Sequence, residues 1–458
     1  MKSWTDPPRG GSAPVIATLA ALLLSGSPAL GQAGPGEPIT LSAAAEMALA
    51  QYPAIGASEA RLSASQDAEK MSTAARWPGL SLSASAMRFQ EPMLVSPLHG
   101  FDPQTVPPFD ETLFQGNVTA RYTVFDGGER GARIDMARSR AEAAEAALRG
   151  THSDVLGQVT RQYALVLAAR DAVAAHDQRV EALGTELDRA ERTFAVGRAP
   201  ELQVLRARAA LAGGQAERVR SVTLLETAQH DLTRLVGASA GEVTAARMAP
   251  VRLVGEDVPA RADLLERAVS SNPDVARMER EIQVARGGVK LARSAFLPDV
   301  SVLGQYDNRA DTNGNSFGEW SFGGMLSFPL FQGGSRRSDL DRARSEERFA
   351  EQQLEMARLK AQEGVDRALA ALQEADARAE SLRSAVEQFT EVVRGEKLAL
   401  DTGTGNQVDY LATEAELLNA RAQLAQATMD RITTRAELAR ITGQLTLEWL
   451  LQNLGDGR

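Results

Sequence analysis

The chain has 458 residues, of which 43% are hydrophobic and 24% are charged, and this balance excludes an intrinsically disordered protein. The absence of cysteine excludes disulfides, thiol catalysis and a lipid-modified N-terminal cysteine. The net charge of −10 argues against nucleic acid as a partner, because binding to phosphates needs a basic surface.

The first 31 residues have the pattern of a secretion signal. Lys2 and Arg9 supply positive charge, and an apolar run of 12 residues follows over 13–24, well short of the ~20 that span a bilayer as a helix. Ala29 and Gly31 suit the −3 and −1 positions of a cleavage site. We therefore predict a signal peptide over residues 1–31; the alternative is a short buried helix in a cytosolic protein. No later stretch approaches 18 apolar residues, so any membrane-spanning part is expected to consist of strands.

The rest of the chain is an internal repeat. Short motifs of the first half recur in the second half. The two copies are 220 residues apart near the start of each half and 206 residues apart after that. The pairs are Tyr52-Pro53 with Asn272-Pro273, Trp77-Pro78 with Leu297-Pro298, Phe125-Asp126-Gly127-Gly128 with Phe331-Gln332-Gly333-Gly334, Val196-Gly197 with Thr402-Gly403, and Leu235-Val236-Gly237 with Ile441-Thr442-Gly443. This pattern predicts a first structural repeat over 32–237, a linker over 238–260, a second repeat over 261–443 and a C-terminal tail over 444–458.

Each repeat is expected to follow one order of elements. In chain order, the predicted elements are a short amphipathic helix (41–51; 262–271), a helix opened by proline (53–76; 273–296), a β-hairpin (79–125; 299–331), a long helix (129–195; 335–401) and a return helix (203–236; 408–442). The offset falls by 14 within the hairpin, so the first hairpin carries 14 additional residues. They fall within the proline-rich segment Met93 to Phe109, which we predict to be a loop outside the cell.

The long helices carry a heptad pattern. Apolar residues recur every seven positions at Val159, Val166, Val173, Val180, Leu187 and Phe194, and again at Val365, Leu372, Ala379, Val386, Val393 and Leu400. Such a repeat is typical of a coiled coil. An ordinary bundle core would explain one such stripe, but not two in matched register. A 67-residue helix is ~100 Å long. The helix opened by proline and the return helix of each repeat, laid end to end, have nearly the same length.

Apolar and polar residues alternate in the four predicted strands, which are about ten residues each, the length that a tilted strand needs to cross a bilayer. Of the 22 aromatic residues, 14 lie within 77–125 and 296–331, where the girdles of a membrane barrel would place them. The alternative is a small sheet packed on the helices, which also alternates. Four strands cannot close a barrel and open edges cannot face lipid, so several chains are expected to share one barrel.

Several short motifs mark the boundaries of the predicted elements: Phe125-Asp126-Gly127-Gly128 and Phe331-Gln332-Gly333-Gly334 before the long helices, Asn272-Pro273, Phe296-Leu297-Pro298, and the helix turns at Val196-Gly197 and Thr402-Gly403. In their order and spacing they resemble the TolC-type outer membrane efflux protein family over roughly residues 40–443. The resemblance implies a mainly α fold with some β structure, built as a homotrimer with a 12-stranded β-barrel and a periplasmic coiled-coil barrel. Its partners would be outer membrane lipid, a periplasmic adaptor (a membrane fusion protein) and an inner-membrane pump of the RND or ABC type.

The same resemblance implies that the helix turns form the periplasmic tip where the adaptor docks. The tip residues would be Val196, Gly197 and Arg198 in the first repeat and Thr402, Gly403 and Thr404 in the second. Asp409 would occupy the place of a pore constriction, although Ala412 stands where a second aspartate is common. The alternative is that Asp409 only complements the helix dipole in the first turn of its helix.

Together with these patterns, the resemblance implies a passive duct for efflux or type I secretion in a Gram-negative outer membrane. We find no catalytic constellation, cofactor fingerprint or metal-ligand spacing, and His176 lies on the heptad stripe, where packing is its expected role. We therefore predict no enzyme activity, no cofactor and no metal. The alternative is a periplasmic coiled-coil adaptor or scaffold, which would share the heptads but not the strands.

Overall fold

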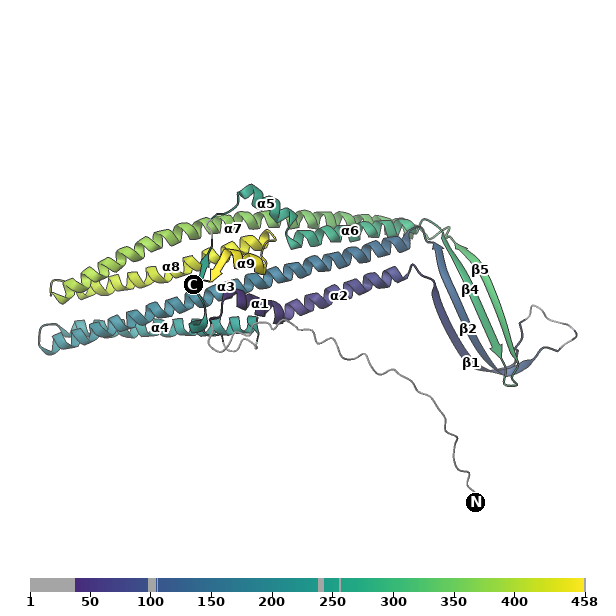
Figure 1. Ribbon diagram of the computed structural model, residues 1–458, viewed down its shortest axis with the longest axis horizontal. Coiled ribbons are helices and arrows are strands. Elements are labelled where there is room, and N and C mark those ends of the chain that lie inside the picture. The colour runs from purple at the N-terminus through teal and green to yellow at the C-terminus, as the bar shows by residue number, and fades with distance from the viewer. Residues whose placement is uncertain (1–37, 98–103, 105, 238–242, 255–256, 457–458) are drawn as a thin grey trace, which may run out of the picture.

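The computed structural model describes residues 38–97, 104, 106–237, 243–254 and 257–456, and the predicted signal peptide lies outside them (Figure 1). The helices are α1 Leu41–Gln51, α2 Pro53–Ala74, α3 Glu129–Ala195, α4 Glu201–Val236, α5 Arg261–Ser270, α6 Pro273–Ser294, α7 Ser335–Asp401, α8 Gln407–Ile441 and α9 Leu447–Asn453, and the 3₁₀ turn η2 spans Ala245–Arg247. The strands are β1 Gly79–Leu94, β2 Phe109–Phe125, β3 Val251–Leu253, β4 Asp299–Ala310, β5 Ser316–Ser327 and β6 Leu454–Asp456. The elements form an elongated body with helices at one end and a sheet at the other.

The two long helices, α3 and α7, have 67 residues each and occupy the ranges that the spacing predicts. Each begins after a pair of glycines with positive φ: Gly127 and Gly128 at 63° and 88°, and Gly333 and Gly334 at 59° and 86°. Two successive left-handed residues turn the chain from the direction of the strand into that of the helix, and only glycine adopts that conformation at little cost. The strand-to-helix junction is therefore determined locally.

The heptad residues lie on the buried faces of α3 and α7. Val159, Val166 and Val365 are fully buried, and Leu372 and Ala379 are nearly so. Burial weakens toward the far end of α3, where Phe194 is 46% exposed. The stripe of α3 thus packs tightly in the middle of the body and loosens near the tip, whereas Leu400 at the end of α7 stays buried.

The shorter helices complete the helical columns. Toward the sheet α2 runs beside α3, while α4 runs beside α3 toward the opposite end. In the second repeat α6 contacts both α3 and α7, and α8 contacts both α7 and α3. The two repeats therefore form one helical body. The return helices α4 and α8 begin at Glu201 and Gln407, slightly earlier than expected. Pro200 and Asn406 occupy their N-cap positions.

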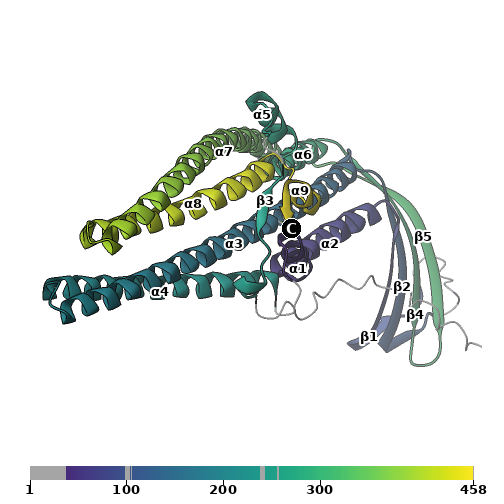
Figure 2. The same cartoon turned by 60° about the vertical axis from the view of Figure 1, so that its left-hand side comes forward.

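The four long strands form one antiparallel sheet in the order β1-β2-β4-β5, which curves away from the helices (Figure 2). The expectation of about ten residues per strand was too short, because the strands have 16, 17, 12 and 12 residues. Met93 and Leu94 still pair with Asp110 and Phe109, so both ends of the predicted loop belong to strands, while residues 98–103 and 105 lie outside the described part. The second hairpin ends at Ser327 rather than at 331, because Pro329 cannot donate a ladder hydrogen bond.

One face of this sheet is polar and the other is apolar. On the polar face Asn117 donates to Asp307 at 2.5 Å, Thr119 donates to Asn117 at 2.6 Å, and Gln305 also donates to Asp307. On the apolar face Trp320 and Phe322 are more than 70% exposed. Such a large apolar surface needs a membrane or a partner to cover it.

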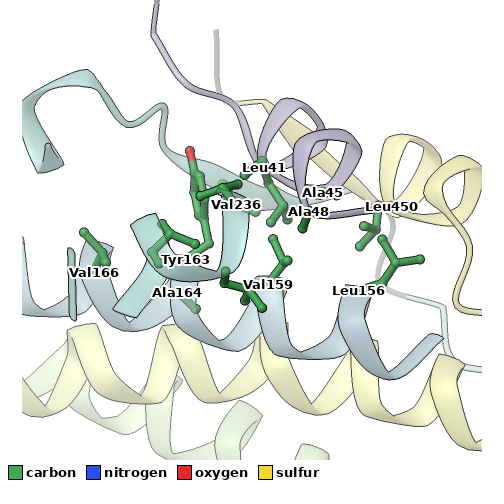
Figure 3. Packing of buried hydrophobic residues seen from close by; sticks show 14 of the residues in the cluster. Leu41, Ala45, Ala48, Leu156, Val159, Tyr163, Ala164, Val166, Val236 and Leu450 are labelled. Carbon is green, nitrogen blue, oxygen red and sulfur yellow. The ribbon is translucent and has the colours of Figure 1, made fainter. Parts of the chain in front are cut away.

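The largest hydrophobic core lies in the middle of the body, around α3 (Figure 3). Leu41 and Ala48 of α1, Val236 of α4 and Leu450 of α9 gather there over the face of α3 that carries Leu156, Val159 and Tyr163. The Tyr163 hydroxyl lies 2.8 Å from the carbonyl of Ile39 and 2.7 Å from that of Ala249. These contacts hold the segment before α1 and the linker between the repeats against α3.

The predicted linker and C-terminal tail contain structure that the sequence reasoning missed. Strand β3, from the linker, pairs antiparallel with β6, from the tail. This two-stranded sheet joins segments that are about 200 residues apart at the level of the central core.

Candidate functional site: the tips of the two helical hairpins

The end of the molecule farthest from the sheet consists of two turns, one after α3 and one after α7 (Figure 1). In the first turn Gly197 has φ 72°, its N–H donates to Phe194, and the Arg198 N–H donates to Thr193 at 2.9 Å. These bonds satisfy the last carbonyls of α3 in the manner of a glycine C-cap. The side chains of Val196 and Arg198 are exposed. The turn therefore presents a mixed apolar and basic surface.

The second turn is tighter and more polar. Gly403 has φ 79°, and the N–H groups of Thr404 and Gly405 both donate to the Ala399 carbonyl at 2.9 Å. The hydroxyls of Thr402 and Thr404 lie 3.1 Å apart. A Cβ at Gly405 would lie 2.7 Å from the Leu400 backbone nitrogen, so glycine is needed there for a steric reason. Asn406 caps α8 by accepting from Val408 at 3.0 Å.

Asp409 lies in the first turn of α8 and its side chain is exposed. Its backbone carbonyl accepts from the Thr413 hydroxyl at 2.9 Å, and its carboxylate has no ion-pair partner among the described residues. The structure thus brings Asp409 near the second turn, as the sequence predicts. Its role in a pore stays a prediction.

Sequence reasoning missed a buried polar cluster close behind the tips. Glu186 of α3 is only 4% exposed and forms a two-pronged ion pair with Arg189, with N–O distances of 2.8 and 2.9 Å. Gln407, the first residue of α8, is equally buried and donates to Glu186 at 2.6 Å. This bond joins residues 221 positions apart and connects the helical hairpin of the first repeat to that of the second. We call Glu186, Arg189, Gln407 and Tyr410 the tip cluster.

The electrostatics of the tip cluster fit its burial. Hydrogen bonding to Glu186 raises the pKa of Arg189, with Asp401 and Tyr410 adding to the shift. Burial is the main cause that raises the pKa of Tyr410, and the neighbouring Glu414, which accepts from its hydroxyl at 3.2 Å, raises it further. Both groups therefore keep their protons throughout the physiological range. In the sequence, Glu186 stands out as a glutamate flanked by apolar heptad residues. No feature of the neighbouring residues identifies Gln407 as its partner.

No helix among the described residues is both long and apolar enough to cross a membrane. The described residues also contain no group of three or more His, Cys, Asp or Glu side chains arranged to hold a metal ion.

Comparison with known proteins identifies the relatives of this chain. The family described as "Outer membrane efflux protein" matches residues 44–238 and 264–444, which correspond closely to the two repeats. Outer membrane protein TolC of Vibrio cholerae serotype O1 is 24% identical over 328 residues, covering 68% of this chain and 73% of that protein. Protein CyaE of Bordetella pertussis is 26% identical over 338 residues, covering 71% of each chain.

A solved structure agrees in fold. The outer membrane protein VceC of Vibrio cholerae is similar with a TM-score of 0.73 at 20% identity, over 88% of this chain and 96% of that one. The family match extends over both repeats and therefore over most of the chain. The chain belongs to the outer membrane efflux protein family, of the TolC type.

Proposed function

We propose that this protein is the outer membrane channel subunit of a tripartite efflux pump or a type I secretion system, and that it acts as a passive exit duct. The observation that carries the proposal is the sheet: one polar face, one exposed apolar face, and two outer strands, β1 and β5, whose outer edges find no partner among the described residues. A sheet of this kind is stable in a lipid bilayer only when its edges are closed.

Closure requires further copies of the chain. Three copies would supply twelve strands, enough to leave a lumen, whereas eight strands leave an interior filled by side chains. The polar network around Asn117 and Asp307 would then face the lumen, and Trp320 and Phe322 would face lipid. The helices α3 and α7, each ~100 Å long, would extend from the barrel into the periplasm.

The adaptor and the pump are proposed partners. The exposed tips at Val196–Arg198 and Thr402–Thr404 are the surfaces farthest from the sheet, and they would meet an adaptor and the RND- or ABC-type pump behind it. A periplasmic adaptor or scaffold would have no use for a four-stranded sheet with an exposed aromatic face.

Native mass spectrometry of the detergent-extracted protein tests the assembly. We expect three chains per particle, recovered from the outer membrane fraction. A stable monomer that retains its full β signal, or recovery from the soluble periplasmic fraction, would contradict the proposal and favour the scaffold alternative.

Replacing Asp409 with asparagine tests the pore constriction. Three symmetric copies of Asp409 would form a ring of carboxylates at the periplasmic mouth, and acidic rings attract cations. In planar bilayers we expect Asp409→Asn to lower the cation-to-anion permeability ratio by about fivefold, the factor that corresponds to ~1 kcal/mol, the energy of two unit charges 4 Å apart in water.

The matched control is Glu201→Gln. Glu201 is an exposed acidic residue in the first turn of α4, the equivalent helix of the first repeat, so it shares the helix-dipole role. If Asp409 only complements the dipole, both variants should show the same slight loss of thermal stability and unchanged selectivity. Unchanged selectivity in a folded Asp409→Asn trimer would remove Asp409 from the constriction.

A further inference from the structure

Arginine side chains brace the junction between sheet and helices in both repeats. Arg130, in the first turn of α3, donates to the carbonyls of Ala75 and Thr123 at 3.4 and 3.0 Å and lies over the Tyr122 ring at 5.8 Å. Its charge is partly compensated by Asp126, whose carboxylate lies 3.5 Å away. The end of α2, the end of β2 and the start of α3 thus meet at one guanidinium.

Arg336 is the equivalent residue in the second repeat. It donates to the carbonyls of Ala295 and Leu330 at 3.2 and 3.5 Å, and its guanidinium carbon lies 5.6 Å from the centroid of Phe296 and 5.7 Å from that of Phe328. The position of Asp126, however, is occupied here by Gln332.

The charge of Arg336 is therefore not compensated by a carboxylate within the described part of the chain. Its recorded partners are two neutral carbonyls and two phenyl rings. Because guanidinium has five N–H donors, three remain after these two hydrogen bonds. Cation–π contacts with the Phe296 and Phe328 rings also restrict the movement of the guanidinium, which lowers the entropy cost of binding an anion.

The neighbours of Arg336 add charge and apolar surface. Arg337 follows it directly, and Arg293 lies two residues before Ala295; both are exposed and have no ion-pair partner among the described residues. Leu330 and Phe331, in the segment that joins β5 to α7, are 84% and 88% exposed. Basic groups beside exposed apolar side chains, at the end of a membrane-length strand, match the boundary between lipid head groups and acyl chains.

We propose that the corner formed by Arg293, Arg336 and Arg337 with Leu330 and Phe331 binds a phospholipid of the inner leaflet of the outer membrane, with preference for an anionic head group. The Arg336 guanidinium would bind the phosphate, the nearby Arg293 and Arg337 would add positive charge, and the two apolar side chains would contact the acyl chains. The site occurs in the second repeat only, because Asp126 neutralises its counterpart in the first. The inference rests on the proposed membrane location of the sheet.

Native mass spectrometry of the delipidated full-length protein, with phosphatidylglycerol or phosphatidylethanolamine added back, tests this site. We expect tight binding of phosphatidylglycerol, up to one molecule per chain, and weaker binding of phosphatidylethanolamine, whose own ammonium group competes with the arginines. Arg336→Gln should weaken phosphatidylglycerol binding by about tenfold, the factor associated with one charge-assisted hydrogen bond. Arg348→Gln is the control, because Arg348 is an exposed arginine further along α7 that donates to Ser345.

Arg336→Lys separates charge from geometry. Lysine keeps the charge but not the planar fork of N–H donors, so this variant should retain preference for phosphatidylglycerol with reduced affinity. Equal binding of the two lipids, or unchanged phosphatidylglycerol binding in Arg336→Gln, overturns the site. An Arg336→Gln protein that no longer forms trimers but still binds phosphatidylglycerol also overturns the site, because Arg336 would then contact a neighbouring chain rather than lipid. Monomers that bind neither lipid would instead indicate that the proposed membrane channel is wrong, and the site would fall with it.

Discussion

Glu186→Ala is expected to lower the free energy of unfolding by about 3 kcal/mol, at the low end of the range for removing one partner of a buried ion pair because Arg189 is partly exposed. The substitution leaves the Arg189 guanidinium without its carboxylate and Gln407 without its acceptor. Because that acceptor joins α3 to α8, the two helical hairpins should also separate more easily near their tips. We therefore expect a larger single-channel conductance in planar bilayers together with a lower unfolding temperature.

Two companion variants separate stability from the opening of the tip. Gln407→Ala removes the bond between the hairpins but keeps the ion pair, so it should raise conductance with a smaller loss of stability, about 1 kcal/mol for one hydrogen bond. Glu391→Ala removes the carboxylate of an exposed ion pair with Arg394, three residues further along the helix, the same sequence spacing as between Glu186 and Arg189. Surface pairs contribute about 0–1 kcal/mol, so this control should change neither property measurably. Conductance that stays at the wild-type value in both Glu186→Ala and Gln407→Ala would show that the tip cluster does not restrain the hairpins.

Gly443→Ala is expected to prevent folding or assembly, with a loss of at least ~4 kcal/mol. Gly443 follows α8 with φ 69°, and a Cβ there would lie 2.1 Å from the Ser271 carbonyl oxygen and 2.7 Å from its carbon. Both are backbone atoms, so no side-chain rotation relieves the contact. The neighbouring Asn272 amide donates to the Ile441 carbonyl at 2.9 Å and closes the other side of the turn. Very little trimer should reach the outer membrane.

The matched control for this variant is Gly334→Ala. Gly334 also has a positive φ, 86°, but a Cβ there would meet no atom within 4 Å. It therefore carries only the strain of a left-handed alanine, about 1–2 kcal/mol. Comparison of the two by trimer yield and thermal unfolding isolates the steric contribution. Equal behaviour of the two variants would mean that the segment containing Ser271 can move aside, and that the close approach is not essential.

Local patterns in the sequence were enough to predict the order of the main elements and the lengths of the two long helices, α3 and α7. The heptad spacing places a buried stripe on α3 and α7, and the paired glycines before each helix specify where the strand ends, since their left-handed conformation depends on the residue itself. Alternation in the strands likewise predicts which face is polar, because successive side chains point to opposite sides. These properties depend on neighbours within a few positions, and they could therefore be predicted without the fold.

The features that depend on distant partners were decided only by the tertiary structure. The pairing of β3 with β6 and the bond from Gln407 to Glu186 each join residues about 200 positions apart. Nothing in a three-residue strand or a single buried glutamate identifies its partner, because the free energy of each depends on the packing that brings the two together. The difference between Arg130 and Arg336 was visible in the sequence as Asp126 against Gln332. Its consequence appeared only when the fold placed each guanidinium between a strand end and a helix end, where a missing carboxylate leaves a positive charge without a partner.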